Sequence, residues 1–298
     1  MNKAMAVVAV AGVVAGGLLP GTATAGEAAT CSLGVGSVTA AGDHKAQTVF
    51  STLPPGASRA GFYATGFFTP GQVKLSSSAV ARDDGFGGSA VSGYVVIGDG
   101  LYRVGYTAAN NTVTGGVTRI GGGWATFVAL EEADYQGPTQ TGITRRNTYA
   151  LGGDGMLFRW TVDSKGVWRN RASAPGFAAV KSMALISKSA TYDTFLANTR
   201  GGALYTIHIP TAAPMKPVVK PVRSRTWQGF EALLAQKCGQ YGTLLLGIDK
   251  DTQSAYLYAV GRATGATTVI QSRGKVPVSF LDPVYFRWKD PGAPLNGE

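Results

Sequence analysis

The sequence repeats one short pattern with a period of about fifty residues. In each copy an apolar strand is followed by a turn containing Gly or Asp, and then by Leu or Phe beside an aromatic residue. The pattern occurs at 95–104, 149–160, 194–207 and 244–260, with a weaker copy at the start of the chain. Successive apolar anchors lie 45 to 54 residues apart, at Phe50, Ile97, Leu151, Leu196 and Leu246. A repeat of this length indicates several copies of one small folding unit that bury their apolar faces against each other.

Each copy is predicted to consist of short antiparallel strands. Gly accounts for 42 of the 298 residues, and Asp-Gly and Gly-Gly turns between apolar runs are typical of β-hairpins. Charged residues are only 15% and hydrophobic residues 45%, so the chain can bury a core. We therefore predict an all-β fold, a five-bladed β-propeller of four-stranded blades at about 45–92, 93–140, 146–190, 191–240 and 241–290. A two-sheet sandwich is the alternative, although a sandwich does not require equal spacing.

Residues 1–25 have the features of a secretory signal peptide. Lys3 precedes an apolar run from Ala4 to Leu19, and Ala23-Thr24-Ala25 provides small residues for cleavage. We expect cleavage after Ala25, an extracellular location, and a single propeller domain over residues 26–298. A membrane anchor is the alternative, but the apolar run is shorter than a spanning helix requires.

The chain contains only two cysteines, Cys31 and Cys238. In the oxidising environment that export implies, they are predicted to form one disulfide. Cys31 precedes the first blade and Cys238 lies where the fourth and fifth blades meet. The disulfide would therefore hold the N-terminal segment near the last blade and close the ring. Two unpaired thiols are the alternative.

Two segments carry a family resemblance. The sequences YALGGDGMLFRW (149–160) and GGGWATFVAL (121–130) resemble the repeat of the tachylectin-like β-propellers, a lectin family. The resemblance implies five blades and binding of N-acetylated hexosamines in pockets between blades. The match is incomplete, because Phe86 and Phe177 stand where the repeat has Trp, and Val278 is not aromatic in the last copy.

Four aromatic residues are candidates for sugar contact. A flat ring can cover the apolar face of a pyranose, and an aromatic residue recurs at one position of the repeat. The alternative is packing between blades. The candidates are Phe86, Trp124, Phe177 and Trp227.

Four charged residues complete the predicted site. Asp99 and Asp154 lie in Gly-Asp-Gly turns, where a carboxylate could accept hydrogen bonds from sugar hydroxyls, act in a glycosidase pair, or simply favour the turn. Arg103 and Arg159 follow the Leu-aromatic pairs and could bind a carboxylate or phosphate on a glycan. Their alternative role is to cap a strand edge or contact a neighbouring blade.

A basic, proline-rich stretch at 210–225 is predicted to be an outer edge strand, because Pro and Lys discourage pairing with another chain. An anionic polymer is the alternative partner for this stretch.

The sequence offers no convincing catalytic constellation. His44 and His208 are the only histidines, and neither lies in a metal or nucleophile motif, so we expect no enzyme activity, no metal and no cofactor. We predict a secreted, lectin-like protein that binds N-acetylated sugars or surface polysaccharide through repeated shallow pockets. The expected protein is a monomer that binds no nucleic acid and does not insert stably into a membrane. One alternative is a glycan-acting hydrolase. The other is a module that binds a protein or an anionic polymer through its net charge, which is +10 for the full sequence and +9 once Lys3 is removed with the signal peptide.

Overall fold

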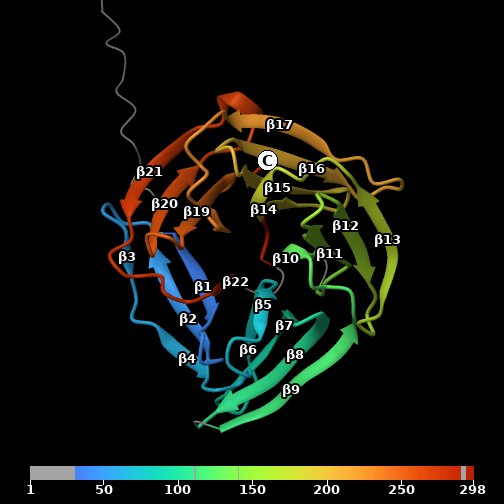
Figure 1. Cartoon of the computed structure of the whole chain (residues 1–298), viewed down its shortest axis with the longest axis vertical. Coiled ribbons are helices and arrows are strands. Elements are labelled where there is room, and N and C mark those ends of the chain that lie inside the picture. Colours follow the sequence, from blue (N-terminus) through green and yellow to red (C-terminus); the bar gives the residue numbers. More distant parts are fainter. Residues whose placement is uncertain (1–30, 111, 140, 290–292) are drawn as a thin grey trace, which may run out of the picture.

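The chain folds into β-sheets that surround a central axis (Figure 1). The computed structural model describes residues 31–110, 112–139, 141–289 and 293–298. These residues form strands and one short 3₁₀ helix, η1 (Gly265–Thr267), which confirms the predicted all-β class. The predicted signal peptide and its cleavage site lie outside the described residues.

Three of the sheets are four-stranded antiparallel meanders. In each of them the first strand lies nearest the axis and the last strand lies outermost (Figure 1). The first sheet contains β10 (Phe127–Tyr135), β11 (Arg145–Gly152), β12 (Leu157–Val162) and β13 (Trp168–Ala174). The second contains β14 (Val180–Lys188), β15 (Tyr192–Thr199), β16 (Leu204–Pro210) and β17 (Val218–Arg223), and the third β18 (Ala232–Cys238), β19 (Gly242–Asp249), β20 (Ser254–Val260) and β21 (Ile270–Lys275).

The second strands of these sheets are almost entirely buried, whereas the outer strands are mostly exposed. β11, β15 and β19 are covered on both faces, because apolar clusters fill the space between each sheet and the next. A strand covered on both faces is expected to be a continuous apolar run rather than an alternating one. These strands carry the repeat anchors Leu151, Leu196 and Leu246, although β11 and β15 also bury polar residues such as Asn147 and Asp193.

The remaining strands form a ten-stranded sheet that joins the two ends of the chain. One part contains β22 (Val284–Lys289), β1 (Ser32–Val38), β2 (His44–Phe50) and the short outer strands β3 (Gly56–Ala57) and β4 (Gly61–Ala64). The other contains β5 (Val73–Ser76), β6 (Ala79–Asp83), β7 (Ser89–Ile97), β8 (Gly100–Ala109) and β9 (Thr112–Gly121). A two-residue parallel pairing between β22 and β6 connects the two parts, and the C-terminal strand β22 also pairs with the N-terminal strand β1.

The strands nearest the axis meet in a closed succession. Contacts run from β5 to β10, β14, β18 and β22, and from β22 back to β5. The disulfide between Cys31 and Cys238 joins the segment before β1 to the end of β18, with the two Cα atoms 5.5 Å apart. This confirms the predicted disulfide and places it where the N-terminal strands meet the preceding sheet.

The sheets are offset from the predicted blade ranges. The predicted range 93–140, for example, covers most of β7 to β9 together with β10, which begins the next sheet. The repeated hairpin corresponds to the second and third strands of a sheet, because those are the strands with the strongest apolar pattern. The sheet that contains β1 takes its innermost strand from the C-terminus, and a pattern of spacing along the chain does not reveal that exchange.

The proline-rich stretch behaves as predicted. β17 is the terminal strand of its sheet, with Pro221 within it, which confirms the edge position. Across the described parts of the chain, no helix is long and apolar enough to cross a membrane.

Candidate functional site

Three of the four predicted aromatic residues have one structural role in common. Trp124, Phe177 and Trp227 lie in the loops that lead from an outer strand to the inner strand of the next sheet, and their side chains are only 5–7% exposed. The backbone N–H of each donates a hydrogen bond of 3.0 Å to a carbonyl oxygen in the hairpin turn of the preceding sheet. The acceptors are Asp99, Gly155 and Gly202, respectively. The repeated aromatic therefore anchors each loop between two sheets.

The two tryptophan rings are covered by other aromatic rings. Trp124 lies against Phe127 and Trp160, with ring centroids 4.5 and 5.5 Å apart. Trp227 contacts Tyr258 at 4.9 Å and Phe230 at 5.6 Å. This geometry is the packing arrangement that was the alternative to a sugar platform, and a sugar contact at these rings stays a prediction.

Asp99 and Asp154 are engaged by backbone amides. The Asp99 carboxylate accepts hydrogen bonds from the N–H groups of Gly123 and Ala125, at 3.0 and 3.1 Å. These bonds lower its pKa, since they stabilise the charged form, and they hold the loop that carries Trp124. Asp154 accepts a bond of 3.0 Å from the N–H of Met156 within its own turn. Both contacts are turn chemistry, and the structure places the two aspartates in different sheets.

The two predicted arginines lie in different surroundings. Arg159 is buried and donates hydrogen bonds to the carbonyl oxygens of Pro210 and Ala212, at 2.6 and 3.4 Å, so it links its sheet to the next one. Arg103 is exposed and lines a groove between the β6–β8 and β10–β12 strands. Binding of an anionic glycan by either residue stays a prediction.

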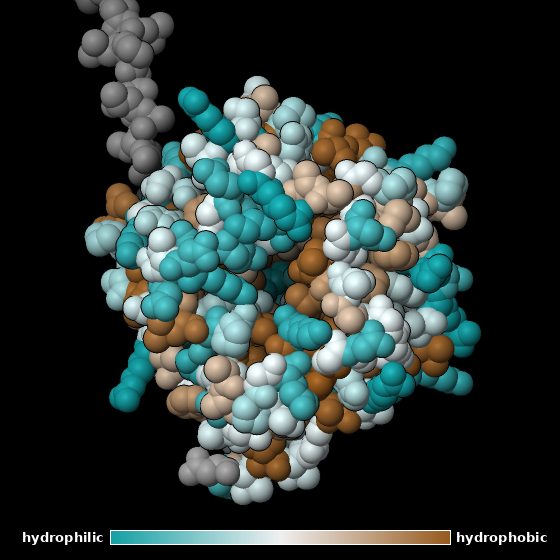
Figure 2. All heavy atoms as spheres, viewed as in Figure 1, coloured by the Kyte–Doolittle hydropathy of each residue, from teal (hydrophilic) through white to brown (hydrophobic). Residues whose placement is uncertain are grey.

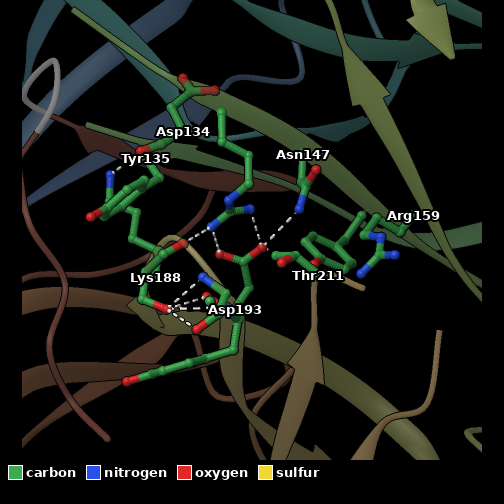
Figure 3. A network of polar contacts seen from close by, with 12 residues as sticks. Asp134, Tyr135, Asn147, Arg159, Lys188, Asp193 and Thr211 are labelled. Carbon is green, nitrogen blue, oxygen red and sulfur yellow. Dashed lines mark hydrogen bonds and ion pairs between the residues drawn. The ribbon is translucent and has the colours of Figure 1, made fainter. Parts of the chain in front are cut away.

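A buried carboxylate, which the sequence analysis did not single out, organises a polar network between two sheets. Asp193 on β15 is fully buried and accepts two hydrogen bonds from Arg145, at 2.6 and 2.7 Å (Figure 3). Asn147 and Tyr149 of β11 donate to it as well, at 3.1 and 2.8 Å. Burial, and then the neighbouring carboxylate, raise the pKa of Tyr149, so this hydroxyl stays a donor. The Asp193 carboxylate accepts four hydrogen bonds in all, three at Oδ2 and one at Oδ1, and is therefore part of the scaffold.

A second charged cluster ties the C-terminal strand to β10. Lys289 of β22 contacts the carboxylates of Glu132 and Asp134, at 2.9 and 3.0 Å. Arg287 contacts Glu131 at 3.4 Å. Burial works to raise the pKa of Asp134, but Lys289 and Lys188 outweigh it, and the pKa falls below its usual value. The three acidic side chains of β10 are thereby paired with cations.

Lys188 lies beside this cluster. Its Nζ donates to the backbone carbonyl of Asp134, as Figure 3 shows. Burial, followed by the nearby cations Arg287 and Lys289, lowers the pKa of Lys188 to about 8. Within the described ranges, no three His, Cys, Asp or Glu side chains are grouped so that they could hold a metal ion.

A wide cleft lies beside β4. It has a volume of about 860 Å³ and lies between β4, the turn that connects β6 to β7, and the ends of β8 and β9. We refer to it as the β4 cleft. Its lining contains Phe62, Tyr63, Thr65, Asp83, Gly87, Gly88, Ser89, Ala108, Ala109, Asn110, Thr112 and Val113, with Ala64 at its base.

The β4 cleft combines aromatic and hydrogen-bonding groups. The Phe62 side chain is 60% exposed, and the neighbouring Tyr63 is held by the ring of Trp288 at 4.6 Å. Oδ1 of Asp83 accepts a hydrogen bond of 2.7 Å from the N–H of Gly85, while its Oδ2 makes none with the residues that the structure describes. Nζ of Lys45 lies 5.9 Å from the centre of the Phe62 ring. An exposed aromatic ring together with polar groups is the composition of many small-molecule sites.

Phe86 is the one predicted aromatic near this cleft. It lies in the β6–β7 turn between two cleft residues, Asp83 and Gly87, and is 93% exposed. Asp84 orders the turn, because it accepts hydrogen bonds of 2.8 Å from the N–H groups of Phe86 and Gly88. The structure thus separates Phe86 from the three buried aromatics. The Phe62-Tyr63 pair was the one feature in the sequence that could have pointed to this cleft. In the repeat pattern the pair is only the apolar-aromatic position of the first copy.

Comparisons with known proteins give weak similarities. No protein-family model and no curated protein matches the sequence. Among solved structures, Aleuria aurantia lectin in complex with Fucα1-6GlcNAc is 16% identical, with a TM-score of 0.45 over 84% of this chain and 80% of that chain. The apocarotenoid oxygenase of Synechocystis is 11% identical, with a TM-score of 0.37 over 82% of this chain and 66% of that one. The WD40 domain of SCAP from fission yeast is 9% identical, with a TM-score of 0.36 over 82% and 70%. These values are too low to support an argument about function.

Proposed function

We propose that this protein binds carbohydrate in the β4 cleft. The observation that carries the proposal is the exposed ring of Phe62 beside Asp83, in a cleft wide enough for a sugar residue. A pyranose has an apolar C–H face that packs on an aromatic ring, and hydroxyls that donate to a carboxylate. Asn110, Thr65 and the hydroxyls of the lining would supply further hydrogen bonds.

The ligand class that we propose is an N-acetylated hexosamine, as the resemblance of the repeats to tachylectin-like propellers implies. Phe86 and Phe62 would provide the apolar contact for the acetyl methyl group. The scaffold that we propose is a five-bladed propeller, and the closed succession of β5, β10, β14, β18 and β22 supports it.

We further propose that the protein acts outside the cell as a monomer. The signal-like sequence of residues 1–25 and the Cys31–Cys238 disulfide support export. The chain pairs its own first and last strands, so ring closure requires no second copy. Binding is favoured over hydrolysis, because backbone amides already engage the predicted carboxylates Asp99 and Asp154.

Titration with N-acetylglucosamine, N-acetylgalactosamine and glucose, followed by NMR and calorimetry, tests the proposal. We expect the acetylated sugars to bind more tightly than glucose and to shift signals from residues 61–65 and 83–89. Phe62→Ala and Asp83→Asn should each weaken binding about tenfold, since a lost stacking or charged contact costs about 1.4 kcal/mol.

Matched controls are available in the β18–β21 sheet, outside the lining of the β4 cleft. Tyr241→Ala removes another aromatic side chain, 47% exposed, and Asp251→Asn removes another exposed carboxylate. Both should leave the affinity unchanged. If the cleft variants bind as the wild type does, or if none of the sugars binds, the β4 cleft is not a carbohydrate site.

A further inference from the structure

A groove between two sheets gathers unpaired positive charge. It lies between the β6–β8 strands and the β10–β12 strands and has a volume of about 220 Å³. Arg82 and Arg103 line it from one sheet, and Arg146 and Lys165 from the other. We refer to it as the cationic groove. It shares no lining residue with the β4 cleft.

The four cationic side chains make no direct ion pair within the described residues, although Arg146 lies near enough to Asp134 to help lower the pKa of that carboxyl. Elsewhere in the protein, buried cations such as Lys289 and Arg145 make ion pairs or hydrogen bonds. The side-chain nitrogens of Arg82, Arg103, Arg146 and Lys165 make neither with any residue that the structure describes. Cations that gather in excess over carboxylates create a local positive potential, which an anion would neutralise.

The carboxylates that line the groove offset only part of this charge. Glu132 and Asp134 line it, but both are bound to Lys289, at 2.9 and 3.0 Å. The nearby Asp163 pairs with Arg169 at 2.9 Å. The lining therefore presents four cations against two carboxylates that share Lys289, so positive side chains outnumber negative ones in the groove.

The turn that carries Lys165 is ordered and lies close to the opposite side of the groove. Asp163 accepts hydrogen bonds from the N–H groups of Lys165 and Val167, at 3.0 and 2.9 Å, so the turn that carries Lys165 is held in place. A Cβ atom added at Gly166 in this turn would lie 3.8 Å from Nη1 of Arg103, so the turn of one sheet reaches the arginine of the other.

Neutral hydrogen-bond donors complete the lining. Ser92, Ser164 and Tyr94 contribute hydroxyls. Burial, and then Glu132, raise the pKa of Tyr94 to about 12, so its hydroxyl keeps its proton at neutral pH. Arginine forks together with hydroxyls are suited to an oxyanion, because guanidinium groups bind carboxylate and phosphate through paired N–H bonds.

We propose that the cationic groove binds a carboxylate or phosphate group of an extracellular anionic polysaccharide. Arg82, Arg103 and Arg146 contact the oxyanion, and Lys165 contributes charge from the turn above it. The site is independent of the β4 cleft and does not require that the cleft bind a neutral sugar.

The test is calorimetric titration with three defined oligosaccharides: one rich in glucuronate, one carrying phosphodiesters, and a neutral one of equal length. We expect one or both anionic probes to bind, with an affinity that falls as salt is added, and the neutral probe not to bind at the groove. The anionic probe that binds more tightly identifies the source of the oxyanion. Failure of both anionic probes to bind would overturn the proposal.

Two triple variants with equal loss of charge separate the groove from general attraction. In one, Arg82, Arg103 and Arg146 are each replaced by Gln. In the other, Lys216, Lys220 and Arg225, which are exposed on and beside β17, are each replaced by Gln. The groove variant should lose at least tenfold in affinity for the anionic probe, and the β17 variant less than twofold. Equal losses would show non-specific attraction and refute the site.

Two further measurements keep the outcome interpretable. Circular dichroism and thermal unfolding of the groove variant establish that it is folded. The groove variant should bind N-acetylglucosamine as the wild type does. The Phe62→Ala variant should bind the anionic probe as the wild type does. Loss of one activity without the other distinguishes failure of this inference from failure of the carbohydrate proposal.

Discussion

The three four-stranded sheets and the ten-stranded sheet differ in how their strands are supplied and how they pack against their neighbours. Between the regular sheets, apolar clusters and the Asp193 network fill the space, and each loop is anchored by one aromatic residue. In the ten-stranded sheet, the strands come from both ends of the chain. In the part that contains β1 and β2, the outer strand is divided into β3 and β4, which both pair with β2. In the part that contains β7 to β9, the inner strand is divided into β5 and β6, which both pair with β7. The β4 cleft lies wholly in this region, and the cationic groove lies at its border. The difference indicates that the regular copies pack through repeated contacts, while the β4 cleft forms where the strands depart from the repeat.

The surface of the ten-stranded sheet carries exposed strands and exposed apolar side chains. Figure 2 shows hydrophilic and hydrophobic residues mixed over this face, which is hollowed at its centre. The outer strand β9 of the ten-stranded sheet is exposed along nearly its whole length, while Phe62 and Phe86 are among the large exposed apolar side chains.

The largest expected effect concerns closure of the ring. Replacing Cys31 and Cys238 by Ser removes a cross-link between residues separated by 207 positions. Chain-entropy arguments give a loss of up to about 5 kcal/mol in the free energy of unfolding. Denaturant unfolding should show the loss, while far-UV circular dichroism should show unchanged strand content. A variant as stable as the wild type would mean that β22 pairing alone closes the ring.

A loss of similar but smaller size is expected in the regular region. Asp193→Ala leaves the Arg145 guanidinium without its ion-pair partner, and should cost about 3–5 kcal/mol. Asp193→Asn keeps part of the hydrogen bonding and should cost less. Chemical denaturation of the two variants measures the difference, and equal values would contradict a role for the charge.

Lys188 of β14 lies near β10 and β22, where the regular sheets meet the ten-stranded sheet, and its pKa makes stability depend on pH. Its folded pKa of about 8 lies below the ordinary value of 10.5, so the unfolded chain binds more protons between these two pH values. Stability should therefore rise with pH across this window in the wild type. Lys188→Met should be more stable than the wild type at neutral pH, by on the order of 2 kcal/mol, and should lose that advantage above the window. Unfolding measured for both proteins at a series of pH values checks the sign, and a constant difference would be evidence against it.

The smallest effect is expected at Asp99. Its carboxylate is exposed, and the amides of Gly123 and Ala125 lower its pKa, so its contribution is present above the unfolded pKa and disappears as the pH falls through the folded pKa. Asp99→Asn should reduce the melting temperature slightly at neutral pH and leave it unchanged in acid. Asp154→Asn, which removes a bond within one turn, is the comparison. A large loss of melting temperature in both would contradict a local role.

Several features were predictable because they depend on neighbours along the chain. The apolar runs and Gly-rich turns indicated hairpins, and the proline-rich stretch indicated the edge strand β17. The repeated aromatic was visible too, but its role was not. The rings of Trp124 and Trp227 are covered by residues from the following sheet, and only the packed structure brings those residues together.

The amino-acid sequence by itself determined the class of fold, the repeat and the pairing of the two cysteines, since local patterning and cysteine count limit these choices. Only the tertiary structure decided where each sheet begins, because β22 and β1 are adjacent in space but lie at opposite ends of the chain. The same holds for the β4 cleft and the cationic groove, whose lining comes from strands far apart in sequence. A hollow forms where packing between sheets is incomplete, and that balance depends on contacts between distant residues rather than on any local pattern.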